Sequence, residues 1–379
     1  MGDNAKKQKT AAIGGPASSK DPGESDGVNH WPLLSDEVVL YILRLLPQKD
    51  LVRSSLIDRR FRTLSRDDSL WTNLTLDIAN IRQNAESCRK LVDRCRKLTS
   101  LKISTVEYRI KLNIMTVVTR AKERLRCLEI DYAMRDWTPA AMEKLGGLQN
   151  LTSLSFTFSS EPYAVNLYKG AEMLEELANL DQLEVLQLTI ERDYYNRPPS
   201  SNSNSLPVMK RVFKQLKKLK EVDIQTPDFD ESLVVTLAEN NPNLRALRFK
   251  NHPFLSDEII DVLANSCPGL EEFTISFEGE GSINKLSSSF PNLKRLEIGN
   301  AKITYEKLTT FVEKFKSLES LDLHDFIGYA TDSGIERMMS SAENLKHLGI
   351  AWAPKVTQGL VDRIRIENPS LDLRIVGRY

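Results

Sequence analysis

Residues that could perform chemistry are few in this sequence, and they do not converge. No Gly-rich phosphate loop, serine-nucleophile turn or zinc-binding HExxH motif is present. In the repeat pattern described below, His324 and His347 stand four strand positions out of step, roughly 13 Å at 3.3 Å per residue, so they could share neither a metal ion nor a proton relay. Carboxylate pairs such as Glu221 and Asp223 fall on one strand face, where nothing removes them from water. We therefore expect no catalysis by this chain, no cofactor and no metal.

The four cysteines indicate a reducing compartment rather than a disulfide framework. They form no CxxC pair and no metal-binding spacing with histidine. Cys88 and Cys95 are seven residues apart, about 10 Å along a helix, which is too far to share an ion. We interpret these two, together with Cys127 and Cys267, as reduced and mostly buried thiols of an intracellular protein in the cytoplasm, the nucleus or both.

The composition is that of an ordinary folded protein. Of 379 residues, 41% are hydrophobic and 27% are charged, and Lys+Arg and Asp+Glu balance at 52 each. This balance does not favour nucleic acid or an acidic membrane surface, and no apolar run approaches the roughly 20 residues of a membrane span. Residues 1–29 are rich in Gly, Ser, Lys and Asp and almost lack large apolar side chains, which predicts a disordered tail.

Most of the remaining chain is an internal repeat. The signature L-x-x-[LVF]-x-[LIF] occurs ten times between Leu98 and Ile350, and successive copies begin 23 to 36 residues apart. An imperfect copy, "LDLRIV", begins at Leu371, and "WTNLTL" from Trp71 fits the same register as a capping copy. The regular period predicts one supersecondary unit for each copy.

The signature predicts a short strand in each unit, followed by a helix. Its fourth and sixth positions alternate with a period of two and therefore point to one face of a strand. Helix starts are indicated by capping residues, which are Ser256, Thr304, Thr331 and Thr357. Only neighbouring units can cover the apolar face of each unit, so we predict an α/β solenoid of about 10–12 repeats over 75–379, with a concave parallel sheet and convex helices.

These repeats resemble the cysteine-containing, cytosolic leucine-rich repeats. The resemblance is carried by the junctions "NPNL" at 241–244, "CPGL" at 267–270 and "NPSL" at 368–371. Two periods are long, and their surplus segments, 161–170 and 191–207, are predicted insertions on the rim of the solenoid. The second insertion is either a loop without a role or part of a binding rim.

The window 30–74 does not fit the repeat register. It predicts three short helices, at 36–46, about 50–56 and about 58–65. The first helix is apolar on nearly every side, and three short helices can hardly enclose so much apolar surface. We therefore expect it to expose several of its apolar residues, as a surface that a partner covers. The candidates are Val38, Val39, Tyr41, Ile42, Leu45 and Leu46.

This window resembles an F-box. The matching residues are Leu34, Asp36, Glu37, Ile42, Leu46, Pro47, Asp50, Leu51, Arg59-Arg60-Phe61 and Ser69-Leu70-Trp71. Two positions depart from the family pattern, which has proline where Ser35 stands and commonly has cysteine at Asp58. Serine is a good helix cap and should leave the helix start intact, whereas Asp58 is expected to loosen the packing of the third helix.

The resemblance implies a non-catalytic substrate receptor of an SCF-type cullin–RING ubiquitin ligase, with a finer likeness to the animal S-phase branch. The F-box would dock on the small SCF adaptor that bridges to the cullin–RING core, and the repeat horseshoe would hold the protein substrate. Trp71 is expected to bridge the F-box and the solenoid. An alternative for the adaptor-contact residues is that about half of them pack inside the F-box or against the first repeat. The predicted adaptor contacts are Trp31, Leu34, Glu37, Val38, Ile42, Leu46, Pro47, Leu51, Val52 and Phe61.

The substrate is expected to bind the later repeats, from about 241 to 354. Aromatic side chains follow several late strands, and such side chains are typical of binding rims, although they could also cap the core between repeats. The concave face is polar and of mixed charge, as any solvated sheet must be. The predicted substrate residues are Arg248, Lys250, Phe254, Arg295, His324, Phe326, Tyr329, His347 and Trp352.

Two other functions are open at this point. The chain could be a stand-alone repeat inhibitor or scaffold, in which 30–74 is only an N-terminal cap; unlike an F-box, a cap would not bind the adaptor. A small-ligand sensor would need a deep polar pocket on the concave face, and the scattered charges there do not converge enough to predict one.

Overall fold

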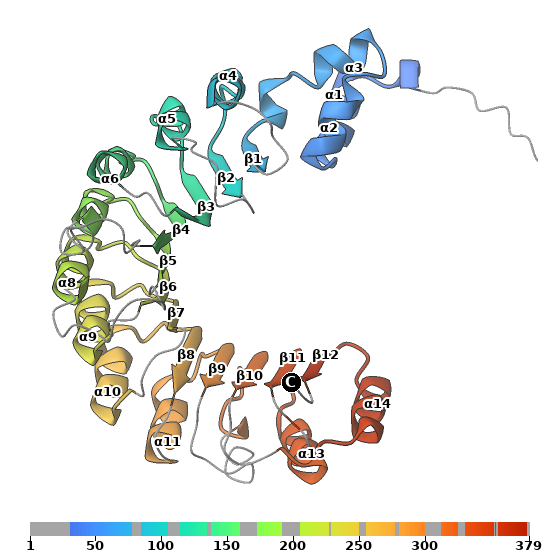
Figure 1. Ribbon diagram of the computed structural model, residues 1–379. Helices are drawn as coiled ribbons and strands as arrows, with labels where there is room; N and C mark the ends of the chain where they lie inside the picture. The colour runs from blue at the N-terminus through green and yellow to red at the C-terminus, as the bar shows by residue number, and fades with distance from the viewer. Residues whose placement is uncertain are drawn as a thin grey trace, which may run out of the picture. The chain divides into compact units, whose positions relative to one another are not determined.

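The structure is a computed structural model that separates into two compact units, Met1–Arg66 and Asp67–Tyr379 (Figure 1). The predicted tail 1–29 lies outside the described residues. The residues that the structure describes are 31–77, 85–104, 114–134, 138–159, 173–191, 205–226, 229–249, 255–276, 280–299, 312–324, 330–351, 353 and 355–376.

The first unit contains three short helices, as the sequence predicts. A 3-10 turn, η1 (Trp31–Leu33), leads into α1 (Asp36–Arg44), which is followed by α2 (Gln48–Ser54) and α3 (Arg59–Leu64). Helix α1 is two residues shorter than predicted because Pro47 lacks an N–H and disfavours helical backbone in the residue before it. The small core of this unit consists of Val39, Leu43, Leu51, Phe61 and Leu64.

Both departures from the family pattern serve as helix caps. The Ser35 hydroxyl accepts a hydrogen bond from the Val38 amide at 3.4 Å, so the start of α1 is intact, as expected. The structure corrects the expectation for Asp58, whose carboxylate accepts a 2.8 Å hydrogen bond from the Phe61 amide and caps α3. A side-chain cap of this kind contributes about 1 kcal/mol, so Asp58 secures the helix rather than loosening it.

The second unit begins with η2 (Asp68–Leu70) and forms one parallel sheet whose strands follow the order of the sequence. Figure 1 shows these strands along the inner side of an arc, with the helices on its outer side. The twelve described strands are β1 (Asn73–Asp77), β2 (Ser100–Ser104), β3 (Cys127–Met134), β4 (Ser153–Ser159), β5 (Val185–Glu191), β6 (Glu221–Gln225), β7 (Ala246–Phe249), β8 (Glu272–Ser276), β9 (Arg295–Gly299), β10 (Ser320–His324), β11 (His347–Ala351) and β12 (Asp372–Val376).

Helices or 3-10 turns connect most of these strands. They are α4 (Ala85–Arg94), α5 (Ile114–Val118), η3 (Thr119–Ala121), α6 (Pro139–Gly146), η4 (Met173–Asn179), α8 (Ser205–Gln215), α9 (Glu231–Asn240), α10 (Asp257–Ser266), α11 (Glu280–Ser289), α13 (Asp332–Ser341) and α14 (Gln358–Glu367). Thr331 and Thr357 cap their helices with their hydroxyl groups, as predicted. Ser256 does not: its hydroxyl donates instead to the Glu231 carboxylate at 3.1 Å. Thr304 lies outside the described residues.

The register of the sheet follows the sequence signature with one exception. Leu74 of the capping copy is aligned with Leu101, as predicted from its 27-residue spacing. The last copy is displaced by one residue, because Leu373 is aligned with Leu348, so this copy begins at Ser370 rather than Leu371. Ser320 is aligned with His347, which confirms that His324 is four positions out of step with that histidine.

The two predicted insertions fall largely outside the described residues. All of 161–170 lies outside them. The second predicted insertion, 191–207, is shorter than predicted. Its first residue, Glu191, is the last residue of β5, and its last three residues belong to α8, which begins at Ser205. The residues between these two elements are not described.

The junction motifs satisfy buried main-chain groups between repeats. Asn241, which is 1% exposed, accepts a 2.9 Å hydrogen bond from the Leu219 amide and donates a 3.0 Å bond to the Leu237 carbonyl. One repeat later, the Cys267 thiol donates to the Asn241 carbonyl with a sulfur–oxygen distance of 3.4 Å. Burial raises the pKa of this thiol to about 11, so it remains protonated and serves as a hydrogen-bond donor. Cys88 and Cys95 are also buried and free, and Cys127 is half-buried and free.

Candidate protein-interaction surfaces

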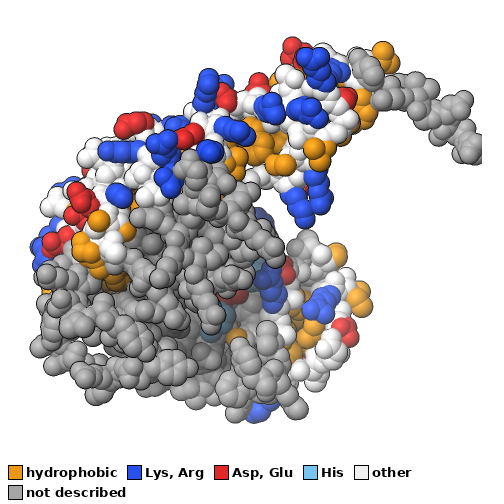
Figure 2. Space-filling model, turned by 45° about the horizontal axis from the view of Figure 1, so that its top comes forward, with side chains coloured by type: hydrophobic (Ala, Val, Ile, Leu, Met, Phe, Trp, Pro, Cys, Tyr) orange, Lys and Arg blue, Asp and Glu red, His pale blue; other side chains and the backbone are white. Residues whose placement is uncertain are grey.

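Exposed apolar side chains are concentrated in the first unit. Eight of the nine exposed large hydrophobic residues in the described part of the chain lie between Trp31 and Ile57, and the ninth is Ile366. The space-filling view in Figure 2 shows hydrophobic side chains at the surface near the N-terminal end of the chain, among basic ones. A concentration of exposed apolar side chains of this kind is typical of a binding site. The eight residues are Trp31, Leu33, Val38, Tyr41, Leu45, Val52, Leu56 and Ile57.

Helix α1 is apolar on two opposite faces. Val39 and Leu43, one helical turn apart, point into the core of the unit and are buried. Val38, Tyr41 and Leu45 recur at helical spacing on the other face, where their exposed fractions are 44%, 63% and 69%. The expected exposure of this helix is therefore confirmed for its outer face, whereas Val39 belongs to the core.

The ten predicted adaptor contacts divide by burial. Trp31, Glu37, Val38, Pro47 and Val52 are exposed, and Leu34, Ile42 and Leu46 are half-buried. Leu51 and Phe61 are each only 4% exposed, so in this structure they pack behind the surface and do not form part of it.

Five exposed apolar residues of this unit were absent from the prediction, namely Leu33, Tyr41, Leu45, Leu56 and Ile57. For Tyr41 and Leu45 a signal was available, because they lie three and seven residues after Val38 on one helix face. The family pattern used for the prediction does not mark these positions.

On the sheet of the second unit, the predicted basic residues are paired with carboxylates of neighbouring strands. Arg248 binds Glu272 through two nitrogens, at 2.9 and 2.5 Å, and Arg295 approaches the same carboxylate at 3.4 Å. His324 lies 3.4 Å from Glu297. The structure thus aligns these residues along the sheet, but it brings each next to an acidic partner rather than into one cationic site.

His347 lies between two carboxylates. Its Nε2 is 3.0 Å from Asp322 on β10 and its Nδ1 is 2.9 Å from Asp372 on β12. Gly349 makes this arrangement possible, because a Cβ at that position would lie 2.0 Å from the Asp322 Oδ1. The other five predicted substrate residues, Lys250, Phe254, Phe326, Tyr329 and Trp352, lie outside the described residues.

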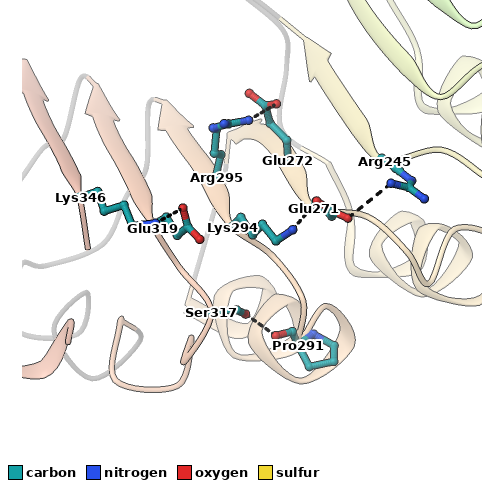
Figure 3. Close-up of polar contacts among 9 residues, drawn as sticks. All are labelled: Arg245, Glu271, Glu272, Pro291, Lys294, Arg295, Ser317, Glu319 and Lys346. Carbon is teal, nitrogen blue, oxygen red and sulfur yellow. Dashed lines mark hydrogen bonds and ion pairs between the residues drawn. The ribbon is translucent and has the colours of Figure 1, made fainter. Parts of the chain in front are cut away.

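A second row of charges lies immediately before the strands and is shown in Figure 3. Glu271 lies between Arg245, at 4.0 Å, and Lys294, at 2.7 Å, and Lys346 pairs with Glu319 at 2.8 Å. Hydrogen bonds from the two lysines lower the pKa of Glu271 and Glu319. Exposed pairs of this kind contribute little to stability, because water and salt screen their charges. Because the charges largely neutralise one another, this row does not form a basic or acidic docking strip.

The described segments contain no helix long and apolar enough to cross a membrane. They also contain no group of three or more His, Cys, Asp or Glu side chains placed to hold a metal ion.

A parallel sheet with one strand per repeat and helices on its outer side is the fold of the leucine-rich-repeat proteins. Residues 33–77 match the family model described as F-box-like, and this match covers the exposed apolar unit. The chain therefore combines an F-box-like domain with the fold of a leucine-rich-repeat array, as the sequence motifs predicted. F-box/leucine-rich-repeat proteins are in general non-catalytic adaptors.

One curated relative and two solved structures illustrate the similarity. A stretch of 135 residues is 30% identical to F-box/LRR-repeat protein 21 of Mus musculus; it covers 34% of this chain and 30% of that protein. Among solved structures, the chain is similar to one in the crystal structure of the Rad7 and Elc1 complex in yeast, with a TM-score of 0.47, 16% identity and coverage of 83% and 77% of the two chains. It is also similar to the LRR protein LIC12759 of Leptospira interrogans, with a TM-score of 0.32, 14% identity and coverage of 84% and 92%.

Proposed function

We propose that this chain is the substrate receptor of an SCF-type ubiquitin ligase. The observation that carries the proposal is the outer apolar face of α1, which lies within the F-box-like match and which nothing in its own unit covers. In this function the chain performs no chemistry: its first unit binds the SCF adaptor, its repeats bind a protein substrate, and ubiquitin transfer belongs to the cullin–RING core. We propose that it acts in the cytoplasm, the nucleus or both.

The proposed adaptor surface has two parts. One consists of the predicted adaptor contacts that are exposed or half-buried, and the other is the exposed apolar face of α1. Val38, Tyr41 and Leu45 form its centre, since they are apolar, exposed and on one helix face. Leu51 and Phe61 support it from behind. The remaining members are Trp31, Leu33, Leu34, Glu37, Ile42, Leu46, Pro47 and Val52.

A double substitution on α1 tests the adaptor surface. Val38→Asp with Leu45→Asp should weaken binding to the purified SCF adaptor by about 100-fold or more, because each exposed aliphatic side chain that becomes buried contributes about 1.5–3 kcal/mol. Both positions are exposed, so the fold should survive. Isothermal titration calorimetry gives the affinity, and circular dichroism checks the helices.

Ile366→Asp is the matched control for this experiment, since Ile366 is also aliphatic and is even more exposed than Val38 and Leu45, but lies on α14 of the second unit. It should bind the adaptor as the wild type does. A wild-type chain that does not bind the adaptor would refute the proposal and favour a stand-alone inhibitor or scaffold. Unchanged affinity in the double variant would show that the adaptor binds elsewhere.

The proposed substrate surface remains the later repeats, where Arg248, Arg295, His324 and His347 line the described strands. Replacing Phe254, Phe326 and Trp352 together by alanine should abolish most substrate capture while leaving the adaptor bound. Quantitative mass spectrometry of proteins co-purified with the chain measures both at once. The α1 double variant is the converse control, because it should keep substrates and lose the adaptor. If the triple variant retains the same captured proteins, the substrate surface lies elsewhere.

A further inference from the structure

Arg60 makes an unusual set of contacts within the first unit. From α3, its guanidinium reaches residues 24 to 29 positions earlier in the chain, which lie in the segment before α1 and at Asp36, the first residue of α1. Its Nε donates to the Asp36 carboxylate at 2.8 Å, and its two terminal nitrogens donate to the carbonyls of Trp31, at 2.9 Å, and Leu34, at 2.5 Å. The same carboxylate lies 2.7 Å from a terminal nitrogen and completes an ion pair. One planar group thus ties two carbonyls of the segment before α1 to the first residue of α1.

The segment held by Arg60 is short, and two further contacts help to order it. Its 3-10 turn is three residues long, and one main-chain hydrogen bond, from the Leu34 amide to the Trp31 carbonyl, closes it at 3.3 Å. The Trp31 ring adds an edge-to-face contact with Phe61 on α3, with the ring centroids 5.2 Å apart. Fixing the backbone of each residue costs conformational entropy, so a segment this short requires anchors of this kind.

The same segment carries part of the proposed adaptor surface. Trp31 and Leu33 are exposed and apolar, and they lie directly before the α1 face formed by Val38, Tyr41 and Leu45. A surface whose parts are already in place binds more tightly, because the partner does not have to order them. We propose that Arg60 is a positioning residue: it need not touch the adaptor, but it fixes Trp31 and Leu33 beside α1 so that they form one surface. This inference rests on the proposed function.

Replacing Arg60 by lysine tests whether the planar shape of the guanidinium group or only its positive charge is needed. Arg60→Lys keeps the positive charge but loses the planar fork that bonds two carbonyls and a carboxylate at once. We expect about tenfold weaker adaptor binding, since a hydrogen bond to a charged group contributes about one power of ten in affinity or stability. Arg59→Lys is the matched control, because Arg59 is the neighbouring exposed residue on α3, and it should bind normally.

A double-mutant cycle distinguishes positioning from general stabilisation. If Arg60 acts through Trp31 and Leu33, then Arg60→Lys should have almost no effect on affinity once both residues are alanine. If it merely supports the fold, its effect should be as large in that background as in the wild type. Additive effects, or an Arg60→Lys variant with wild-type affinity, would overturn the inference while leaving the proposed function intact.

Hydrogen–deuterium exchange of the free chain tests the same idea without the adaptor. The amides of residues 33–36 should exchange faster in Arg60→Lys than in Arg59→Lys, whereas those of α2 should not differ. If the wild-type chain fails to bind the adaptor, the proposed function is refuted. The exchange experiment still tests whether Arg60 holds the segment, because it does not require the adaptor. Equal exchange in the two variants would show that Arg60 does not hold the segment.

Discussion

Replacing Asn241 by alanine is expected to lower the free energy of unfolding by about 2–4 kcal/mol. The substitution leaves the Leu219 amide and the Leu237 carbonyl without the side-chain partner that each has now, in a place where water cannot replace it. Each buried group that loses its hydrogen bond costs about 1–3 kcal/mol. The effect should therefore exceed that of most single substitutions in the chain.

Asn368→Ala provides the comparison, because Asn368 occupies the same motif in the last repeat. Its amide donates to the Ile364 carbonyl with a longer separation of 3.4 Å, and the residue is half-buried. Urea denaturation followed by circular dichroism measures both variants, and the slope of each transition shows whether the array still unfolds as one unit. A loss for Asn241→Ala no greater than that for Asn368→Ala would show that water or another group satisfies the Leu219 amide.

The stability of the last repeats is expected to fall as the pH rises above neutrality, and His347 is the group responsible. Partial burial acts to lower its pKa, but the hydrogen bonds and charges of Asp322 and Asp372 outweigh burial and raise the pKa above its ordinary value. Both ring nitrogens face carboxylates, so the protonated ring, with two donors, is the form that fits. Arg374, which lies 2.8 Å from Asp372, is a further charge at this site.

The direction of this pH dependence follows from the raised pKa. The stabilisation is fully present below the unfolded-state pKa of about 6.5 and is lost as the pH rises through the higher pKa of the folded state. The difference in unfolding free energy between wild type and His347→Gln should thus be about 1–3 kcal/mol near pH 6 and shrink at higher pH. Urea denaturation at several pH values measures it.

Gly349→Ala is the second arm of this experiment. A Cβ at Gly349 would collide with the Asp322 carboxylate, so that carboxylate must turn away from His347. The pKa of His347, followed by NMR titration, should fall towards its ordinary value, and the pH dependence of stability should weaken. A titration curve identical to that of the wild type would mean that Asp322 does not hold the proton on His347.

The repeat array was predictable because the apolar residues that form its core recur at regular intervals in the sequence. Strand positions follow from the alternation of leucines such as Leu321 and Leu323, and the register between neighbouring copies follows from their spacing. The last copy was misplaced by one residue because the prediction puts Leu371 at its first position. The frame that begins at Ser370 instead places Leu373 and Ile375 at the two alternating apolar positions, and these residues pair with Leu348 and Ile350 of β11. The role of Gly349 was not visible, since it depends on a side chain 27 residues away in the sequence.

The first unit was predictable in outline and less so in detail. The apolar run of α1 indicated two apolar faces, but the family pattern does not distinguish Val38 on the surface from Val39 in the core. The same pattern selected Phe61, which is buried, and omitted Leu45, which is exposed. Asp58 was misjudged because a departure from a family pattern was interpreted as a defect, whereas the local backbone uses the carboxylate as a cap.

The two-faced helix α1 also bears on how the protein can exist in a cell. An uncovered apolar face favours association with other apolar surfaces, and a partner that binds only the folded chain shifts the folding equilibrium in its favour. If the adaptor covers Val38, Tyr41 and Leu45, its supply limits how much of this chain stays soluble and escapes the quality-control machinery. The amount of receptor would then follow the amount of adaptor, without any dedicated regulator.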